Sequence, residues 1–437
     1  EPLGASSPTP DAAAIEAVAA QTVGAERLTA EGPPPEGETT WPVPDELTGA
    51  MGVSVRDLIT GEELFASNAS QGLVPASTLK ILTAAAALSA LGPDATLTTA
   101  AVLSRGQGGS AVVTLVAGGD TTLGPDAGDP ASVMGRAGMG DLAREAATGL
   151  RRSGASSATV TLDDTVFSGP ATYPDWGWGL GTTWGAPATP LAILDGRAGE
   201  AFDAVTYVAD PALRAAEHFA ALLAQAAADP AVALPQVTVD VSVTRAAAPA
   251  EGRVVAEASS APIRELVGQQ LRESDNTLSE ALGRAAAVAL GHPGSFEGCA
   301  AGVGQALGDL GVPTAGLRLD DCSGLSHGSR IPASTLTGVL ALTGGERGPE
   351  VGGVARGLAV GGLQGTVAER FTGAPGAGNV RAKTGTLTGV TALAGLVQTA
   401  AGRELAFALI ANPDPQVGTL GARNAMDRFV EGLAALR

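Results

Sequence analysis

The clearest hydrophobic pattern comes early in the chain. Residues 51–58 and 63–66 alternate apolar with polar side chains on either side of a Thr-Gly turn, which predicts an antiparallel hairpin. An almost wholly apolar stretch follows at 78–91 and ends at a Gly-Pro pair, which predicts a buried helix.

Helical periodicity returns in the C-terminal half of the chain. It predicts helices at 262–273, 277–290, 296–310 and 333–343, then two strongly apolar strands at 389–398 and 404–411, and a closing helix at 417–436. We expect the early hairpin, the first buried helix and the late strands to form one domain of sheet and helices.

A different pattern separates these two halves. Between residues 100 and 257 strands at 111–117, 158–162 and 236–243 alternate with helices at 139–152 and 211–228. This alternation predicts an inserted α/β domain with a weak internal repeat. The expected domains are therefore 38–99 together with 258–437, interrupted by 100–257. Residues 1–37, rich in Ser, Pro and Ala, predict a disordered or extended linker with at most one short helix.

Composition and charge exclude several functional classes. The 437 residues carry 26 basic and 45 acidic side chains, a net charge of −19, and no Lys/Arg cluster, so we expect no nucleic-acid partner. No apolar run reaches the length of about 18 residues that a membrane span needs. The three histidines lie far apart and no His or Cys pair has metal-ligand spacing, so we expect no metal and no cofactor.

Lysine usage points to specific positions. Only two of the 26 basic residues are lysines, Lys80 and Lys383. Lysine can lose its proton in a protein whereas arginine cannot, so these two positions are candidates for chemistry in which Arg would fail.

Both lysines lie in short patterns that suit an acyl-enzyme mechanism. Ser77 precedes Lys80 by three residues at the start of the first buried helix, so the two side chains share a helix face. Lys383-Thr384-Gly385-Thr386 lies directly before an apolar strand, and Ser274-Asp275-Asn276 lies at a junction of two predicted helices. Each pattern alone is common on protein surfaces, but the three in this order are typical of penicillin-interacting serine enzymes.

Further segments extend the pattern from about residue 42 to residue 437. They are Val74-Pro-Ala-Ser-Thr-Leu-Lys-Ile-Leu-Thr-Ala, Gly118-Gly-Asp-Thr-Thr-Leu, Asp163-Asp-Thr-Val-Phe, Asp321-Cys-Ser-Gly-Leu-Ser, Gly361-Gly-Leu-Gln-Gly-Thr and Val380-Arg-Ala-Lys-Thr-Gly-Thr. With them, the chain resembles the penicillin-binding-protein superfamily. In particular it resembles the class C low-molecular-mass D-alanyl-D-alanine carboxypeptidases and endopeptidases, peptidase family S13, of actinobacterial type. The 197 positions between Ser77 and Ser274 resemble the inserted-domain arrangement of that family.

The resemblance implies a fold and a set of roles. The fold would be a penicillin-binding-protein/β-lactamase-like transpeptidase domain, an antiparallel sheet flanked by helices, of α/β (α+β) class and interrupted by an inserted α/β domain. Residues 168–207 would be a reduced third subdomain or a loop. Ser77 would be the nucleophile and Lys80 its general base, with Lys383 as a second cation that helps lower the pKa of Lys80.

The remaining site residues take their roles from the same resemblance. Ser274 would pass a proton to the leaving amine, and Asn276 would position Lys80 and the substrate amide. Thr384, Gly385 and Thr386, with Lys383, would bind the terminal carboxylate. The backbone N–H groups of Ser77 and Thr386 would form the oxyanion hole.

The implied activity is that of a serine DD-peptidase. It would be a D-Ala-D-Ala carboxypeptidase, with DD-endopeptidase action as an option, on peptidoglycan stem peptides, inhibited covalently by β-lactams. We expect an exported protein of the cell envelope whose signal or anchor is removed or lies upstream of residue 1. In that compartment Cys299 and Cys322 could form a disulfide, the alternative being two buried thiols. A β-lactamase on the same fold and a penicillin-sensing envelope module without turnover are the alternatives for function.

Overall fold

The structure is a computed structural model that describes residues 7–23, 51–176, 184–199, 201–204, 206–230, 235–413 and 419–437. It divides into two compact units, each built from separate stretches of chain. Unit 1 comprises Glu1–Pro93, Val267–Asp275 and Ala300–Arg437, and unit 2 comprises Asp94–Leu266 and Asn276–Cys299.

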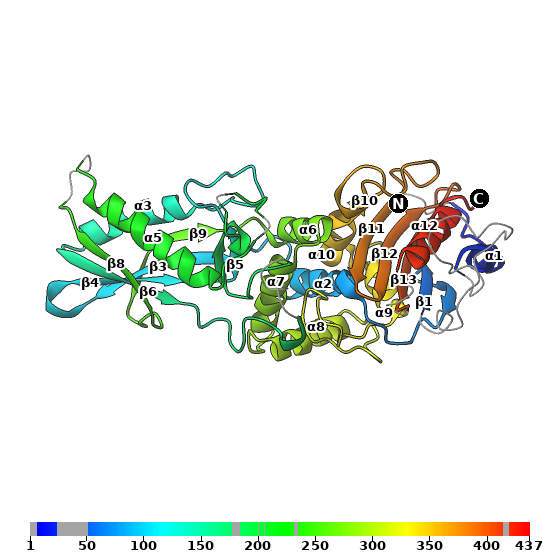
Figure 1. The fold of residues 1–437 in the computed structure, drawn as a ribbon, viewed down its shortest axis with the longest axis horizontal. Coiled ribbons are helices and arrows are strands. Elements are labelled where there is room, and N and C mark those ends of the chain that lie inside the picture. The colour runs from blue at the N-terminus through cyan, green and yellow to red at the C-terminus, as the bar shows by residue number, and fades with distance from the viewer. Residues whose placement is uncertain are drawn as a thin grey trace. The chain divides into compact units, whose positions relative to one another are not determined.

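Unit 1 is built on a six-stranded antiparallel sheet that joins the two ends of the chain. Its order is β10 (Ala359–Val360), β11 (Val380–Leu387), β12 (Val390–Gln398), β13 (Glu404–Ala411), β1 (Met51–Asp57) and β2 (Glu63–Ser67). The expected pairing of the early hairpin with the late strands is confirmed, because β1 runs antiparallel to β13 from Met51↔Ala411 to Asp57↔Leu405. Helix α12 lies along one face of this sheet (Figure 1), and the strands and α12 share one apolar core.

The longer helices at 76–91 and in the C-terminal half of the chain lie close to the predicted ranges. Together with shorter helices, they include η3 (Ala76–Leu79), α2 (Lys80–Leu91), α6 (Ile263–Glu273), α8 (Phe296–Asp309), α9 (Ala333–Leu342), α10 (Gly348–Val351), α11 (Gly353–Gly357), η7 (Gly365–Val367) and α12 (Leu420–Ala434). Helix α2 is buried from Lys80 to Leu88, as its apolar composition predicted. No helix in the described ranges combines the length and apolar character that crossing a membrane would require.

The short helix that the prediction allowed within the N-terminal linker is present, and it packs into the core of unit 1. Residues Ala12–Thr22 form helix α1, capped by the Asp11 side chain, which accepts a hydrogen bond from Ala13 N at 3.1 Å. Ile15 is fully buried and Ala19 nearly so, in the same apolar core as Phe429 of α12. Burial of this short apolar face supplies the stability that an 11-residue helix lacks in isolation. The remainder of the predicted linker lies outside the described residues.

Unit 2 has a five-stranded mixed sheet covered by two helices. The order is β8 (Thr238–Arg245), β6 (Ser157–Asp163), β4 (Ala111–Val116), β3 (Thr98–Arg105) and β9 (Arg253–Ser259). Strands β4, β6 and β8 are parallel, connected through α3 (Met139–Arg152) and α5 (Pro211–Ala228), and β3 and β9 add antiparallel pairs. Apolar faces of both helices pack on this sheet.

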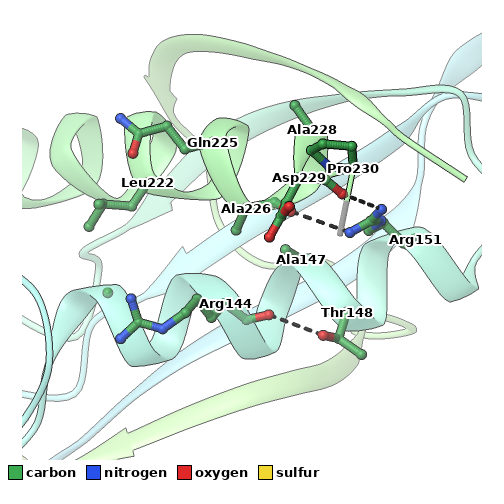
Figure 2. Close-up of a pocket in the computed structure, with 11 residues that line it drawn as sticks. Arg144, Ala147, Thr148, Arg151, Leu222, Gln225, Ala226, Ala228, Asp229 and Pro230 are labelled. Atoms are coloured by element: carbon green, nitrogen blue, oxygen red, sulfur yellow. Dashed lines mark hydrogen bonds between the residues drawn. The ribbon is translucent and has the colours of Figure 1, made fainter. Parts of the chain in front are cut away.

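A buried arginine, Arg151, is one of the residues that line the pocket between α3 and α5 (Figure 2). Arg151 is 3% exposed and donates to the Asp229 carbonyl at 2.9 Å and the Pro235 carbonyl at 3.1 Å. A guanidinium beside the C-terminal carbonyls of α5 satisfies acceptors that a helix end leaves unpaired. The pocket of about 650 Å³ beside it contains none of the predicted site residues, and Arg151 there serves the packing of the two helices.

The boundaries of the units differ from the expected ones at several points. Residues 94–99, 258–266 and 276–299 were expected in the catalytic domain, whereas the structure groups them with unit 2. In helix α7 (Asn276–Ala289) Thr277 Oγ1 accepts from Ala186 N at 2.9 Å, and Arg284 donates to the Ser168 and Pro170 carbonyls. These bonds fasten α7 to the loop segments of unit 2.

The described part of 168–207 is mostly loop. It contains β7 (Leu191–Ile193), which pairs in parallel with β5 (Asp120–Leu123), and the short helices η5 (Pro174–Trp176) and η6 (Leu194–Gly196). Residues 177–183, 200 and 205 of this stretch lie outside the described residues. A reduced third subdomain therefore remains a prediction.

Candidate active site

The first motif places a serine and a lysine side by side in unit 1. Ser77 lies on η3, and Lys80 is the first residue of α2. Lys80 Nζ donates to Ser77 Oγ at 3.0 Å. Ser77 is partly exposed whereas Lys80 is fully buried, so an accessible hydroxyl lies beside a buried amino group, the arrangement that the predicted roles of nucleophile and base require.

A loop that the sequence analysis did not assign a role holds Lys80 in place. Lys80 Nζ also donates to the Ser323 carbonyl at 2.6 Å. Asp321 fixes this turn, because its two carboxylate oxygens accept from Gly324 N at 2.8 Å and from Ser326 N at 2.7 Å. Asp321 followed by Gly324 is typical of a side-chain-stabilised turn, a signal that could have identified the residue.

Gly324 lets this turn approach the nucleophile. Its φ is +82°, and a Cβ at this position would lie 2.0 Å from the Ala76 carbonyl oxygen. Any larger residue would push the turn away from the segment that carries Ser77. The turn at Ser323 therefore sets the position of Lys80 relative to Ser77.

The second and third motifs also meet within unit 1. Lys383 Nζ on β11 donates to Ser274 Oγ at 2.8 Å and to the Thr384 carbonyl at 2.8 Å. Ser274 has a φ of +58°, an uncommon backbone conformation for a residue other than glycine. Such conformations persist where the surrounding structure enforces them and are concentrated at functional sites.

The two lysines influence each other electrostatically. Burial, and secondarily the charge of Lys80, lower the pKa of Lys383 well below its usual value. Holding two ammonium groups here at once is therefore unfavourable. A lysine in its neutral form can act as a general base.

Strand β11 lies directly against the nucleophile. A Cβ on Gly385 would lie 2.7 Å from the Pro75 carbonyl oxygen and 3.1 Å from Ser77 N. Only glycine allows this approach without displacement of the backbone. Gly385 is buried, whereas Thr386 beside it is exposed. This proximity suits the predicted oxyanion hole, which needs the N–H groups of Ser77 and Thr386 close together.

Asn276 is the predicted residue whose place differs most from expectation. It begins α7 and is grouped with unit 2, and its Nδ2 donates to the Trp184 carbonyl at 2.6 Å. It follows Ser274 by two residues in the chain. The role expected for it toward Lys80 stays a prediction.

Of the two alternatives that the sequence left open for Cys299 and Cys322, the structure has two fully buried thiols that are not joined. Unoxidised cysteine packs well in protein interiors as a small apolar residue. The backbone of Cys322 has a role of its own, since its carbonyl accepts from Thr83 Oγ1 of α2 at 2.7 Å.

A buried carboxyl group lies apart from these motifs, in unit 2. Asp120 is fully buried, and its Oδ1 accepts from Thr122 N and Thr122 Oγ1, both at 2.7 Å. Its Oδ2 is buried and has no hydrogen-bond partner among the residues that the structure describes. Burial raises the pKa of Asp120 to about 6, against the lowering effect of these hydrogen bonds.

Comparison with known proteins agrees with this geometry. The sequence profile of the D-Ala-D-Ala carboxypeptidase 3 (S13) family matches residues 43–233 and 196–435. A carboxypeptidase of Mycobacterium tuberculosis, Rv3627c, is 36% identical over 397 residues, which cover 89% of this chain and 81% of the relative. Carboxypeptidase DacB of Mycolicibacterium smegmatis is 37% identical over 366 residues, which cover 82% of this chain and 75% of the relative.

Solved structures show the same fold. The crystal structure of penicillin binding protein 4 (dacB) of Haemophilus influenzae matches with a TM-score of 0.71 and 21% identity, covering 96% of this chain and 98% of that one. Its complex with a β-lactam matches with a TM-score of 0.66 and 20% identity, covering 89% and 96%. The family profile spans nearly the whole patterned chain, and the serine and lysine pairs lie where an acyl-enzyme mechanism needs them. This chain therefore belongs to the S13 family of serine-type D-Ala-D-Ala carboxypeptidases.

Proposed function

We propose that this chain hydrolyses the D-Ala–D-Ala bond of peptidoglycan stem peptides through an acyl-enzyme on Ser77. The observation that carries the proposal is the 3.0 Å hydrogen bond between Lys80 Nζ and Ser77 Oγ at a partly exposed serine. The family of the chain supports the substrate class.

Acylation begins when Ser77 Oγ attacks the carbonyl carbon and its proton passes to a neutral Lys80 Nζ. The negative charge that develops on the carbonyl oxygen is stabilised by the N–H groups of Ser77 and Thr386. When the tetrahedral intermediate collapses, the C–N bond breaks, the leaving amine takes a proton from Ser274, and Ser274 is reprotonated by the ammonium of Lys383 that donates to it. Water then attacks the ester, the Ser77 oxygen takes back the proton held by Lys80, and the proton released by the new carboxyl group restores the ammonium of Lys383 as the shortened peptide leaves.

Substrate binding adjusts the charge on the two lysines. The terminal carboxylate would sit beside Lys383, Thr384 and Thr386, and its negative charge would raise the pKa of Lys383 back toward the ammonium form. A protonated Lys383 in turn favours the neutral, basic form of Lys80. Productive binding and activation of the base are then coupled.

The same acylation chemistry explains the expected response to β-lactams. A penicillin presents a strained amide and a carboxylate to Ser77 and to the Lys383 subsite, and it forms an ester that is lost slowly. Because peptidoglycan lies outside the cytoplasmic membrane, the proposed activity places the protein in the cell envelope.

Release of D-alanine from a stem pentapeptide tests the proposal. The wild-type protein should release one D-alanine per peptide, whereas Ser77→Ala should release none above background. Ser242→Ala, on exposed strand β8 of unit 2, is the matched control and should keep full activity. D-alanine release by Ser77→Ala at the wild-type rate would refute the proposal.

A further inference from the structure

A hydroxyl group outside the three motifs lies beside the proposed carboxylate site. Thr366, on η7, is exposed, and its Oγ1 accepts a hydrogen bond from Thr384 Oγ1 at 3.1 Å. Thr384 in turn offers its carbonyl to Lys383 Nζ at 2.8 Å. Thr366 therefore extends the chain of hydrogen bonds that begins at Lys383 and passes through Thr384.

The backbone next to Thr366 is held firmly against the same strand. Gly365 has a φ of +67°, and a Cβ there would lie 2.7 Å from Ala359 Cβ and 2.8 Å from the Arg272 carbonyl oxygen. Ala359 itself pairs with Ala382 of β11, one residue before Lys383. Thr366 is thus placed by a close-packed turn rather than by an open loop.

The direction of the hydrogen bond decides which proton is available to a ligand. The Thr384 hydroxyl donates its proton to Thr366 Oγ1. Of these two hydroxyls, only that of Thr366 can therefore donate a hydrogen bond to a ligand. A hydroxyl whose oxygen already accepts a hydrogen bond becomes a stronger donor. A carboxylate offers about four lone-pair sites, so it can accept from Thr366 as well as from Lys383 and Thr386, while the Thr384 hydroxyl stays hydrogen-bonded to Thr366.

We propose that Thr366 is a further substrate-binding residue, whose hydroxyl donates to the terminal carboxylate and helps to select acids over amides. This inference rests on the proposed function, because it takes the carboxylate-binding role of β11 as given. It adds a specificity determinant from a turn that precedes β11 by more than a dozen residues in the sequence.

The test compares an acid with its amide. In a Ser77→Ala background, calorimetry measures the Kd of a D-Ala-D-Ala stem peptide and of the same peptide with a C-terminal amide. Thr366→Val removes the hydroxyl at nearly constant volume, and Thr366→Ser retains it. Hydrogen bonds to charged groups predict that Thr366→Val weakens binding of the acid about tenfold or more, with the amide changed about twofold at most. Thr366→Ser should bind the acid nearly as the parent does, and kcat/KM of the otherwise wild-type variants should follow the same order.

The outcomes separate this inference from the proposed function. Acid binding unchanged in Thr366→Val, or an equal loss for acid and amide, would overturn the role of Thr366. Turnover of the peptide by Ser77→Ala would overturn the proposed mechanism. The role of Thr366 would then be decided by the ratio of the Kd values for the acid and the amide. Failure of the Ser77→Ala protein to bind the acid peptide at all would overturn both.

Discussion

Adding one methyl group at Gly385 should slow acylation without touching any reacting atom. The new Cβ would lie 2.7 Å from the Pro75 carbonyl oxygen and 3.1 Å from Ser77 N. Carbon–oxygen contacts normally begin at about 3.3 Å, so β11 and the segment before Ser77 must separate by about 0.6 Å. Both neighbouring atoms belong to backbone, and no flexible side chain can move aside instead.

The size of the effect follows from this displacement. A misplacement of about 1 Å costs about a hundredfold in rate, so Gly385→Ala should slow acylation by a penicillin about tenfold. Overpacking of a buried position should also lower the free energy of unfolding by about 1–3 kcal/mol. Rapid-quench mass spectrometry measures the second-order acylation rate, and thermal unfolding measures stability.

Gly304→Ala provides the matched control. Gly304 lies on α8, and in the described part of the chain no atom beyond its own helical neighbours is within 4 Å of the place its Cβ would take. This variant should acylate at the wild-type rate and gain about 0.5–1 kcal/mol from better helix propensity. Acylation of Gly385→Ala within about twofold of wild type would refute the close approach of β11 to the nucleophile.

Four further predictions concern the charged groups. Lys80→Arg keeps the charge but cannot give up its proton, so acylation should fall by about 10²–10⁴, and an unchanged rate would exclude Lys80 as the base. Asp321→Asn loses one of the two backbone hydrogen bonds that hold the turn next to Lys80, so kcat should fall about tenfold. The pH profile of kcat should also shift, and a loss of stability alone would not cause that shift. The folded protein lowers the pKa of Lys383, so the unfolded chain binds more protons between that lowered pKa and about 10.4. The free energy of unfolding should therefore rise with pH over this window. Denaturant titrations should show that this rise is absent in Lys383→Met. The pKa of Asp120, raised from 3.8 to about 6, should make the free energy of unfolding fall by up to about 3 kcal/mol between pH 4 and 6, and equal slopes in wild type and Asp120→Asn would contradict it.

Much of the architecture was accessible from hydrophobic pattern alone. The strands 389–398 and 404–411 and the helix 78–91 were predicted nearly as they occur, because long apolar runs bounded by turn residues determine their own element type. Strand β3 (Thr98–Arg105) was not predicted. Its Thr and Ala residues have little pattern of their own, and their strand conformation depends on pairing with β4 and β9.

The residues of the candidate site likewise differ in how far the sequence alone identifies them. Ser77, Lys80, Ser274 and Lys383 could be named from the sequence because their predicted chemistry restricts the residue type, and the structure joins them in two hydrogen-bonded pairs. Thr366 lies in a segment that the sequence singled out, but it received no role, because its contact with Thr384 arises from a turn that folds back onto β11.

Helix α1 was underestimated for a related reason. Its Ala-rich sequence has only a weak apolar face, and Ile15 becomes a core residue only because α12 covers it. Sequence patterns predict which surfaces are apolar, but they do not identify the partner that buries a small one.

The central claim is that Ser77 is the nucleophile of a penicillin-sensitive DD-peptidase, and intact mass after brief incubation with a penicillin tests it most directly. We predict one adduct per chain on the wild-type protein and on Ser242→Ala, lost slowly over time, and none on Ser77→Ala. An unmodified protein that destroys the drug would indicate a β-lactamase instead. An adduct on Ser77→Ala, or neither adduct nor drug loss with the wild type, would contradict the account.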